Sequence, residues 1–432
     1  MSADRMILGA GQNASFSMNS DLTGLNNNVI VAASSGGGKT VSIMEPRLLE
    51  TFHSSLIVTV SKRRIVEKYT DIFLERGYEV LDLNFVHPEQ STIAYDPLKY
   101  IKDFGDITFF ASALVKSNPR KSITTADPFW DDISISILSA MIALVRETKI
   151  HPTIVDVLKL HDQLTIQEDG DGITTSLDSD FAALARKDPF CFAVTSWNSF
   201  KNLPPKTANC AYGTLNTTLD KIFTPQLRSM IEKKQKISFE HLASRKTVLF
   251  VSTSAVNPSL HAFVNMFYSQ MFKQLFEYAE SLPDGRLPIP VSVLCDDFAV
   301  GSRIQNFPEY ISIFREKQIN VTLLLQSESQ LESMYGYDDA VTIIDNCDTY
   351  VYMGGMNLQT CRSISERLNI PLEDVLYMPI GQEIIFRRGQ KPIITQRYDT
   401  FSNSDYKAVT RQYEKKCAER KAQAEDDINL LL

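Results

Sequence analysis

The sequence has few of the residues that cross-link small folds or hold metals. Its six cysteines lie far apart without a C-x-x-C pair, and its six histidines form no H-E-x-x-H motif. These absences argue against a disulfide framework and against a zinc site. The cysteine usage is typical of a protein from a reducing cytoplasm.

Signals for export and for membrane insertion are also missing. The N-terminus, MSADRMILGAGQ, has neither the basic start nor the apolar core of a signal peptide. The longest nearly uncharged apolar stretch, Ile133 to Val145, is shorter than the roughly 20 residues that a membrane helix needs. The sequence therefore predicts a soluble chain.

An excess of positive charge is the third absence. The formal net charge is −8, which excludes binding of nucleic acid by bulk positive charge and leaves only local contacts. What is present is 432 residues that are 44% hydrophobic and 22% charged. This composition predicts two or three globular units and excludes disordered and fibrous classes.

Short apolar, β-branched runs alternate with helical patterns in the first and last thirds of the chain. Such continuous runs are typical of parallel strands buried on both faces. We expect strands at 29–33, 55–60, 78–85, 247–253, 291–297, 320–327 and 349–355, and a hairpin at 383–398. No comparable run lies between 103 and 236, where the pattern is helical. We therefore predict an α/β domain split by an all-helical insertion.

Residues 33–40 read ASSGGGKT and lie between the first strand and a helical stretch, Val41 to Thr51. This is the [AG]-x-x-x-x-G-K-[ST] phosphate loop, in which backbone N–H groups cradle phosphate oxygens. Lys39 is expected to reach the β- and γ-phosphates, and the Thr40 hydroxyl to ligate Mg²⁺. A glycine-rich turn before a helix is the alternative, but strand, loop and helix together favour nucleotide binding. The expected nucleotide-contacting residues are Ser35, Gly36, Gly37, Gly38, Lys39 and Thr40.

The strand VSVLCDD supplies the acids that such a loop requires. Asp296 is expected to hold the magnesium. Asp297 is expected to act as general base on the attacking water, although a loop-capping role is the alternative. Gln326 follows the next strand, where it either orients water near the γ-phosphate or simply satisfies the strand terminus.

With the phosphate loop placed, the domains can be assigned. Residues 1–102 and 237–400 form the two parts of a nucleotide-binding domain, 103–236 an all-helical inserted domain, and 401–432 a charged C-terminal helix or tail. Within the insertion, Trp130 fits a core position better than a base-stacking one. The basic residues between Lys201 and Lys236 fit either a pore that tracks phosphates or a solvated helix face.

An ordered series of segments resembles one family, the ATPase domains of type IV secretion coupling proteins, the TraG-like conjugation ATPases of the HerA–FtsK superfamily. The series covers nearly the whole chain and is far more specific than a phosphate loop alone. Beside ASSGGGKT, the segments are GYEVLDLNF followed by AYDPLKYI, DPFWDDISISILSAMIAL at 127–144, the block from Cys295 to Gly336, and IIDNCDTYVYMG at 343–354.

This resemblance implies a RecA-like domain with a mostly parallel sheet and an inserted all-α domain. It implies homo-hexameric rings that use ATP and Mg²⁺ to pass single-stranded DNA with its relaxase, or secreted proteins, into a secretion channel. It implies a place at the inner face of the cell membrane, with a membrane anchor supplied in trans or by a missing N-terminal segment. The alternatives are a substrate-docking receptor with weak ATPase activity and a related DNA segregation or packaging translocase.

The resemblance also assigns roles residue by residue. Lys39 and Thr40 match the phosphate and magnesium residues, and Asp296 the metal acid. Asp297 matches the catalytic acid and Gln326 the sensor glutamine. A further match gives Arg315 a role at the nucleotide of a neighbouring subunit; from the residues alone, Arg315 is an ordinary solvated helix arginine.

Three departures from the family pattern are visible. The catalytic acid is commonly Glu and is here the shorter Asp297. The family's D-P-K-G-E stretch is replaced by VSKRR at 60–64. Most members carry transmembrane helices before the phosphate loop, and Lys39 lies too close to the start of this sequence to leave room for them.

Overall fold

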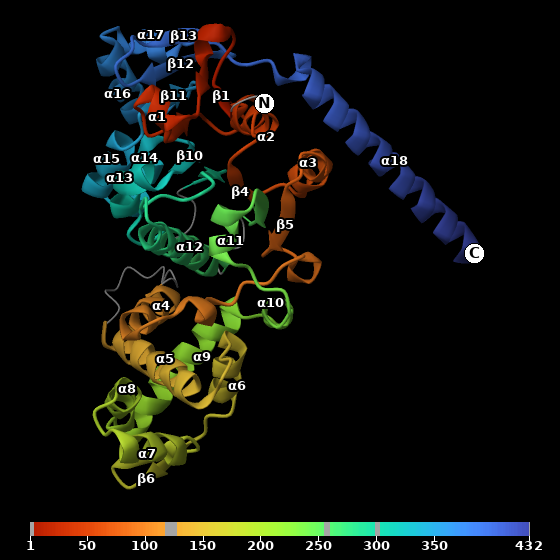
Figure 1. The fold of residues 1–432 in the computed structure, drawn as a ribbon. Helices are drawn as coiled ribbons and strands as arrows, with labels where there is room; N and C mark the ends of the chain where they lie inside the picture. The colour runs from red at the N-terminus through yellow and green to blue at the C-terminus, as the bar shows by residue number, and fades with distance from the viewer. Residues whose placement is uncertain (1–3, 117–127, 255–259, 299–302, 432) are drawn as a thin grey trace. The chain divides into compact units, whose positions relative to one another are not determined.

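The computed structural model describes residues 4–116, 128–254, 260–298 and 303–431 and divides into two compact units (Figure 1). Unit 1 comprises residues 1–82, 238–253 and 272–432; unit 2 comprises 83–237 and 254–271. The predicted insertion, 103–236, falls inside unit 2. Of the quoted segments, Asp127 in the opening of the insertion and residues 299–302 in the block after Cys295 lie outside the described residues.

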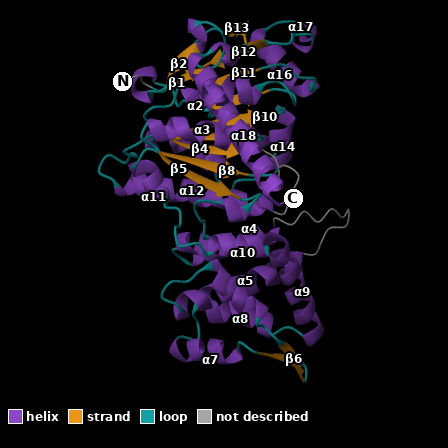
Figure 2. Cartoon of the chain, turned by 90° about the vertical axis from the view of Figure 1, so that its right-hand side faces the viewer, coloured by secondary structure: helices purple, strands orange, loops and turns teal. Residues whose placement is uncertain are grey.

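The described residues form a nine-stranded central sheet in the order β13-β12-β11-β3-β10-β9-β4-β8-β5 (Figure 2). The run from β11 through β3, β10, β9 and β4 to β8 is parallel, and the hairpin β12–β13 adds antiparallel strands beside β11. The strands are β3 (Val29–Ala32), β4 (Ser55–Val60), β5 (Glu79–Asn84), β8 (Thr247–Ser252), β9 (Val291–Cys295), β10 (Ile319–Leu325), β11 (Thr349–Tyr352), β12 (Gln382–Arg387) and β13 (Ile393–Gln396). Each predicted strand is present, and the α/β fold class with a mostly parallel sheet is confirmed.

Apolar side chains on both faces explain why the inner strands form continuous runs. Every residue of β3, β4, β8, β9, β10 and β11 is buried. On one face, Leu56 and Val58 of β4 join a core with Leu48 of α2 (Glu45–Leu49), Tyr69 of α3 (Arg63–Glu75) and Tyr406 of α18 (Ser404–Leu431). Helices on both faces are what a parallel sheet requires.

The helices of unit 1 follow the alternating pattern of the sequence. The predicted hairpin and the charged C-terminal segment are both found, the latter as the helix α18. A short antiparallel pair, β1 (Arg5–Ile7) and β2 (Ser15–Ser17), was not expected from the sequence. The helices are α1 (Ser20–Thr23), a π-helical turn (Thr40–Met44) that continues into α2 (Glu45–Leu49), α3 (Arg63–Glu75), α11 (Phe239–Ser244), α13 (Phe307–Lys317), α14 (Glu328–Tyr335), α15 (Tyr337–Asp345), α16 (Leu358–Leu368), α17 (Leu372–Leu376) and α18 (Ser404–Leu431). Helix α12 (His261–Ser281) spans the boundary between the units.

Unit 2 is helical around α5, which packs against α4, α6, α8 and α9. An antiparallel hairpin, β6 (Ile166–Asp169) with β7 (Gly172–Thr175), is an exception to the all-helical prediction. Its D-G-D-G turn places Gly170 at φ +60, and such turns favour hairpins. The helices are α4 (Phe104–Lys116), α5 (Pro128–Thr148), α6 (Ile154–Asp162), α7 (Asp178–Lys187), α8 (Phe192–Lys201), α9 (Pro205–Ile222) and α10 (Pro225–Ile231).

Helix α5 is longer than the apolar stretch read from the sequence. With 21 residues it meets the length and composition of a membrane span, and 56% of its most apolar window is buried inside the structure. The core helix of a soluble domain has the same properties. Among the described residues, no other helix meets these criteria.

Candidate functional site

The carboxyl ends of β3, β10, β9 and β4 surround a cavity of about 400 Å³ in unit 1. Because these strands are parallel, the residues that follow them meet at the same edge of the sheet. The cavity brings together nearly all of the predicted site residues. Its lining consists of Ser35, Gly36, Gly37, Gly38, Lys39, Thr40, Val41, Ser61, Lys62, Asp296, Asp297 and Gln326.

The glycines of the phosphate loop are required by its backbone. Gly36 and Gly38 have φ values of +73 and +83, in the left-handed region that side chains disfavour. A Cβ on Gly37 would lie 2.8 Å from the carbonyl oxygen of Ser34. The N–H of Ser42 donates to Gly38 at 2.8 Å and begins the following helix. The loop is thus an open concavity at a helix N-terminus, which suits an anionic ligand.

Lys39 lies against the loop that precedes it. Its ammonium donates to the carbonyl oxygens of Ala33 at 2.7 Å and Ser34 at 3.3 Å. Burial lowers the pKa of Lys39 from its ordinary value, and Asp297 and Asp296 offset part of this effect. The charge is held beside two carboxylates, at the edge of the cavity where phosphates would enter.

Asp296 and Thr40 form a pair of oxygen ligands suited to magnesium. The Thr40 hydroxyl donates to the Asp296 carboxylate at 3.5 Å. Burial and the neighbouring Asp297 raise the pKa of Asp296 to about 6, against the lowering effect of Lys39 and Lys62. The carboxylate pair therefore carries negative charge that the protein does not fully compensate, and a divalent cation fits it. Because Mg²⁺ takes one or two protein oxygens plus phosphates and water, it needs no larger acidic cluster, and the described residues contain none.

Asp297 and Gln326 complete the cavity from β9 and β10. Asp297 has φ +53, a left-handed conformation that Asp tolerates better than most residues. Gln326 is exposed, and its backbone N–H donates to the side-chain oxygen of Gln330 at 3.2 Å. Both side chains are available to a water molecule or a phosphate in the cavity.

Arg315 is the one predicted site residue that does not line the cavity. It lies in α13, where Ile311 and Phe314 are buried, as the helical pattern predicts. Arg315 is exposed and forms no ion pair with a described residue. Its position allows contact with another molecule and gives it no role in its own chain's site.

The sequence analysis did not identify two residues after β13, of which Arg397 lies beside Gly38 of the phosphate loop and Thr400 bonds the turn that follows the loop. The Arg397 Nη2 donates to the carbonyl oxygen of Met353 at 2.6 Å, and its Nη1 lies 3.3 Å from where a Cβ on Gly38 would be. The Thr400 hydroxyl donates to the carbonyl oxygen of Val41 at 2.6 Å. No sequence motif marks them, because they are more than 350 positions from the loop.

Several of the basic residues between Lys201 and Lys236 have partners within unit 2. Lys201 pairs with Asp178, and Arg228 with Asp162 at 2.7 Å. Lys233 donates to the carbonyl oxygen of Ser91 at 2.6 Å. These contacts favour structural roles for much of this stretch.

The two tryptophans of unit 2 each contact a phenylalanine ring. Trp197 is 2% exposed and stacks on Phe181 with ring centroids 4.3 Å apart. Trp130 is half-buried against Phe129. Trp197 is therefore a core residue.

The parallel sheet, the phosphate loop at the end of β3 and the acids at the end of β9 define the RecA-like class of P-loop NTPase folds. Comparison with known proteins places the chain within that class. The sequence matches the family described as type IV secretory system conjugative DNA transfer over residues 3–369. The chain therefore belongs to this family, as the resemblance implied.

Solved structures of low sequence identity share the fold. The chain resembles the bacterial conjugative coupling protein TrwB in complex with sulphate, with a TM-score of 0.62 and 14% identity over 92% of this chain and 91% of that one. A TrwB complex with ADP and Mg²⁺ has a TM-score of 0.60 at 14% identity and the same coverage. VirB4 of Thermoanaerobacter pseudethanolicus has a TM-score of 0.53 at 11% identity, over 91% of this chain and 96% of that one. No curated protein matches the sequence.

Proposed function

We propose that this protein is a Mg²⁺-dependent ATPase that couples hydrolysis to the transfer of single-stranded DNA with its relaxase, or of protein substrates, into a type IV secretion channel. The carrying observation is the single cavity that joins the phosphate loop, the Asp296–Asp297 pair and Gln326. Membership of the conjugative DNA transfer family supports the secretion context. The related protein TrwB has been solved in complex with ADP and Mg²⁺ and with non-hydrolysable ATP and GTP analogues, which supports these ligands.

The chemistry would be attack of water on the γ-phosphorus. A bond forms from the water oxygen to phosphorus, the bond to the β-bridging oxygen breaks, and ADP leaves with the electron pair. Asp297 accepts the proton of the water, and Gln326 orients the water. Lys39 stabilises charge on the phosphates. Thr40 and Asp296 would hold the magnesium, which neutralises phosphate charge when bound.

A homo-hexameric ring would supply the remaining catalytic group. Arg315 is exposed and lies outside its own cavity, so we propose that it enters the site of the neighbouring subunit. A trans-acting arginine is worth about 10³–10⁵ in rate in other phosphoryl-transfer systems. We also propose a position at the inner face of the cell membrane through secretion partners or an anchor.

An ATPase assay with and without single-stranded DNA, across protein concentration, tests this function. A ring-forming motor shows DNA-stimulated turnover that rises faster than linearly with protein. If the ATPase rate is the same with and without single-stranded DNA at every protein concentration, DNA translocation is contradicted and a docking receptor is supported instead.

Mixing variants tests the trans role of Arg315. Arg315→Ala is expected to bind nucleotide normally and hydrolyse poorly, and Lys39→Ala to be inactive. A mixed ring contains interfaces in which an intact Lys39 meets an intact Arg315, so partial turnover returns. If subunit exchange is verified and no activity returns, or if Arg315→Ala alone is fully active, Arg315 does not act in trans.

A further inference from the structure

One charged residue lines the nucleotide cavity without an assigned role. Lys62 follows β4, in the VSKRR stretch that replaces the family's D-P-K-G-E. It is exposed, and its ammonium forms no ion pair with a described residue. A lysine that faces a cavity without an internal partner is available to an anionic ligand.

The sheet order places Lys62 opposite Lys39. In the parallel pair β4–β9, Thr59 lies beside Cys295, so the residues after β4 run beside Asp296 and Asp297. The strands follow in the order β3-β10-β9-β4. The two lysines therefore approach the cavity from opposite sides of the carboxylate pair.

The backbone around Lys62 is fixed at both ends. Before it, the carbonyl oxygen of Val60 accepts the N–H of Thr253 at 3.0 Å. After it, the carbonyl oxygen of Lys62 accepts the N–H of Ile65 at 3.1 Å, at the start of α3. Only Ser61 and Lys62 lie between these anchors.

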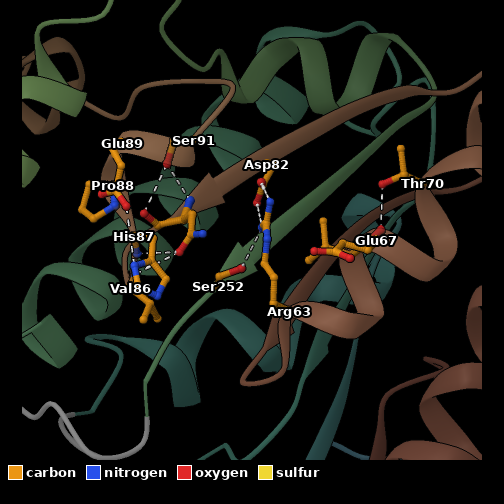
Figure 3. Close-up of polar contacts among 12 residues, drawn as sticks. Arg63, Glu67, Thr70, Asp82, Val86, His87, Pro88, Glu89, Ser91 and Ser252 are labelled. Carbon is orange, nitrogen blue, oxygen red and sulfur yellow. Dashed lines mark hydrogen bonds and ion pairs between the residues drawn. The ribbon is translucent and has the colours of Figure 1, made fainter. Parts of the chain in front are cut away.

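Arg63 strengthens the second anchor (Figure 3). Its Nη1 donates to one Asp82 carboxylate oxygen at 2.7 Å and to the Ser252 hydroxyl at 3.5 Å, and its Nη2 donates to the other oxygen of Asp82. This fork-to-fork pair directs Arg63 across β8 toward β5 and away from the cavity. Lys62 is the residue left to face the cavity.

The local electrostatics suit a phosphate at this position. Lys62 lies close enough to Asp296 to oppose part of the rise in the pKa of that carboxyl that burial and Asp297 cause. The first turn of α3 contains no acidic residue, so the positive end of its dipole is uncompensated. The positive charge of Lys62 and the positive end of the α3 dipole both favour an anionic ligand such as a phosphate.

We infer that Lys62 is a second lysine for the terminal phosphate of a bound nucleoside triphosphate, contacting it from the end of β4 while Lys39 contacts it from the phosphate loop. This inference rests on the proposed function. It makes Lys62 a residue that discriminates a triphosphate from a diphosphate, because the γ-phosphate lies beyond the α- and β-phosphates that a phosphate loop cradles.

Binding of a slowly hydrolysed ATP analogue and of ADP, both with Mg²⁺, tests the inference in the full-length chain. Lys62→Ala is expected to raise the Kd of the ATP analogue by about 10- to 100-fold, as loss of a charge-assisted hydrogen bond does. The Kd of ADP should change by less than about twofold, because the contact is absent there. Lys62→Arg, which keeps the charge, is expected to retain part of the discrimination.

Arg64→Ala is the matched control, since it removes the same charge two positions away, outside the cavity lining. It should leave both Kd values unchanged. Equal increases for both nucleotides in Lys62→Ala, or no change in either, would overturn the inference. Failure of the proposed function would give a different result. The parent chain would still prefer a triphosphate over a diphosphate, but its turnover would not be stimulated by DNA.

A double-mutant cycle separates contact from positioning. Asp82→Asn removes the charge that holds Arg63 and is expected to weaken triphosphate binding in the same direction as Lys62→Ala, but less. If Arg63 acts by placing Lys62, the double variant should be no weaker than Lys62→Ala alone. Full additivity of the two effects would show that the Arg63–Asp82 pair does not position Lys62.

Discussion

The central sheet has a polar cavity beside the carboxyl ends of its strands, of about 400 Å³, and another beside the amino ends, of about 270 Å³. Both are lined largely by polar residues of the loops that adjoin several strands. Size and polarity alone do not distinguish them. Their charges do, because the buried carboxylate beside one cavity is stabilised by partners within the protein and the one beside the other is not fully compensated.

The acids beside the amino-end cavity are satisfied by the protein itself. Asp4 accepts the backbone N–H groups of residues 52–54 at distances between 2.7 and 2.9 Å. Burial alone would raise the pKa of Asp4, but Arg47 and these hydrogen bonds lower it below its ordinary value. Asp21 pairs with Arg286 at 3.1 Å. Both acids of this cavity thus have partners within the protein.

The acids at the carboxyl ends are left incompletely compensated. Burial beside Asp297 raises the pKa of Asp296 to about 6 although Lys39 and Lys62 act against it. Such uncompensated charge is costly and gathers at functional sites. The comparison teaches that charge balance, more than cavity volume, identifies the site.

The largest expected effect is that of Lys39→Ala. Hydrolysis should fall by about 10³–10⁵-fold, because a charge that stabilises the transferring phosphoryl is lost. The melting temperature should hardly change, since the ammonium contacts only loop carbonyls. The measurement is steady-state phosphate release, with the exposed Lys206→Ala as control. Unchanged turnover would mean that the charges at the carboxyl-end cavity do not mark it as the functional site.

Asp297→Asn is expected to reduce kcat by about 10²–10⁴-fold while nucleotide still binds, because an amide accepts no proton from water. Asn also tolerates φ +53, so the backbone should persist. Single-turnover hydrolysis and nucleotide binding measure the two properties, with the exposed Asp284→Asn as control. Hydrolysis at the parental rate would mean that Asp297 caps the loop and that the base lies elsewhere.

Asp4→Asn should act on stability alone. Replacing one acceptor oxygen by a donor leaves a buried backbone N–H without a partner, at a cost of about 1–3 kcal/mol of unfolding free energy. Denaturant unfolding measures this loss. Nucleotide affinity, measured on the folded variant, should stay within about twofold of the parent, as expected for distant sites. A loss of nucleotide binding without a loss of stability would show that Asp4 is not purely structural.

Glu383→Gln is expected to have the smallest effect on turnover, and it tests the link between charge balance and function at a buried acid outside both cavities. Glu383 is fully buried without hydrogen bonds, and burial raises the pKa of Glu383 to about 8, against the lowering effect of Arg397. The native state therefore binds this proton more tightly than the unfolded chain, so stability falls as pH rises from about 4.5 to 8, by at most about 1.4 kcal/mol per pH unit.

In Glu383→Gln that slope should disappear from denaturant unfolding measured across this pH range, and turnover at pH 7 should persist. The parent is expected to be neutral at this position at pH 7. An unaltered slope would assign the titration to another group, and abolished turnover would give Glu383 a role in the site.

Local sequence was sufficient for the elements in which a short segment determines its own structure. The buried runs of β3, β9 and β10 identified the inner strands, because only a parallel sheet covered on both faces buries every position. The phosphate loop and the Asp296–Asp297 pair followed from the residues next to those strands. The β6–β7 hairpin was missed because its short strands bury few side chains.

The sequence by itself determined the family, the strands and the phosphate loop, since each depends on neighbouring residues. Only the tertiary structure decided which distant residues share the cavity. Lys62 reaches it because β4 lies beside β9, and Arg397 reaches Gly38 because the chain after β13 returns to the phosphate loop. Strand order places these residues together, and strand order is set by packing across the whole sheet, which no local pattern records.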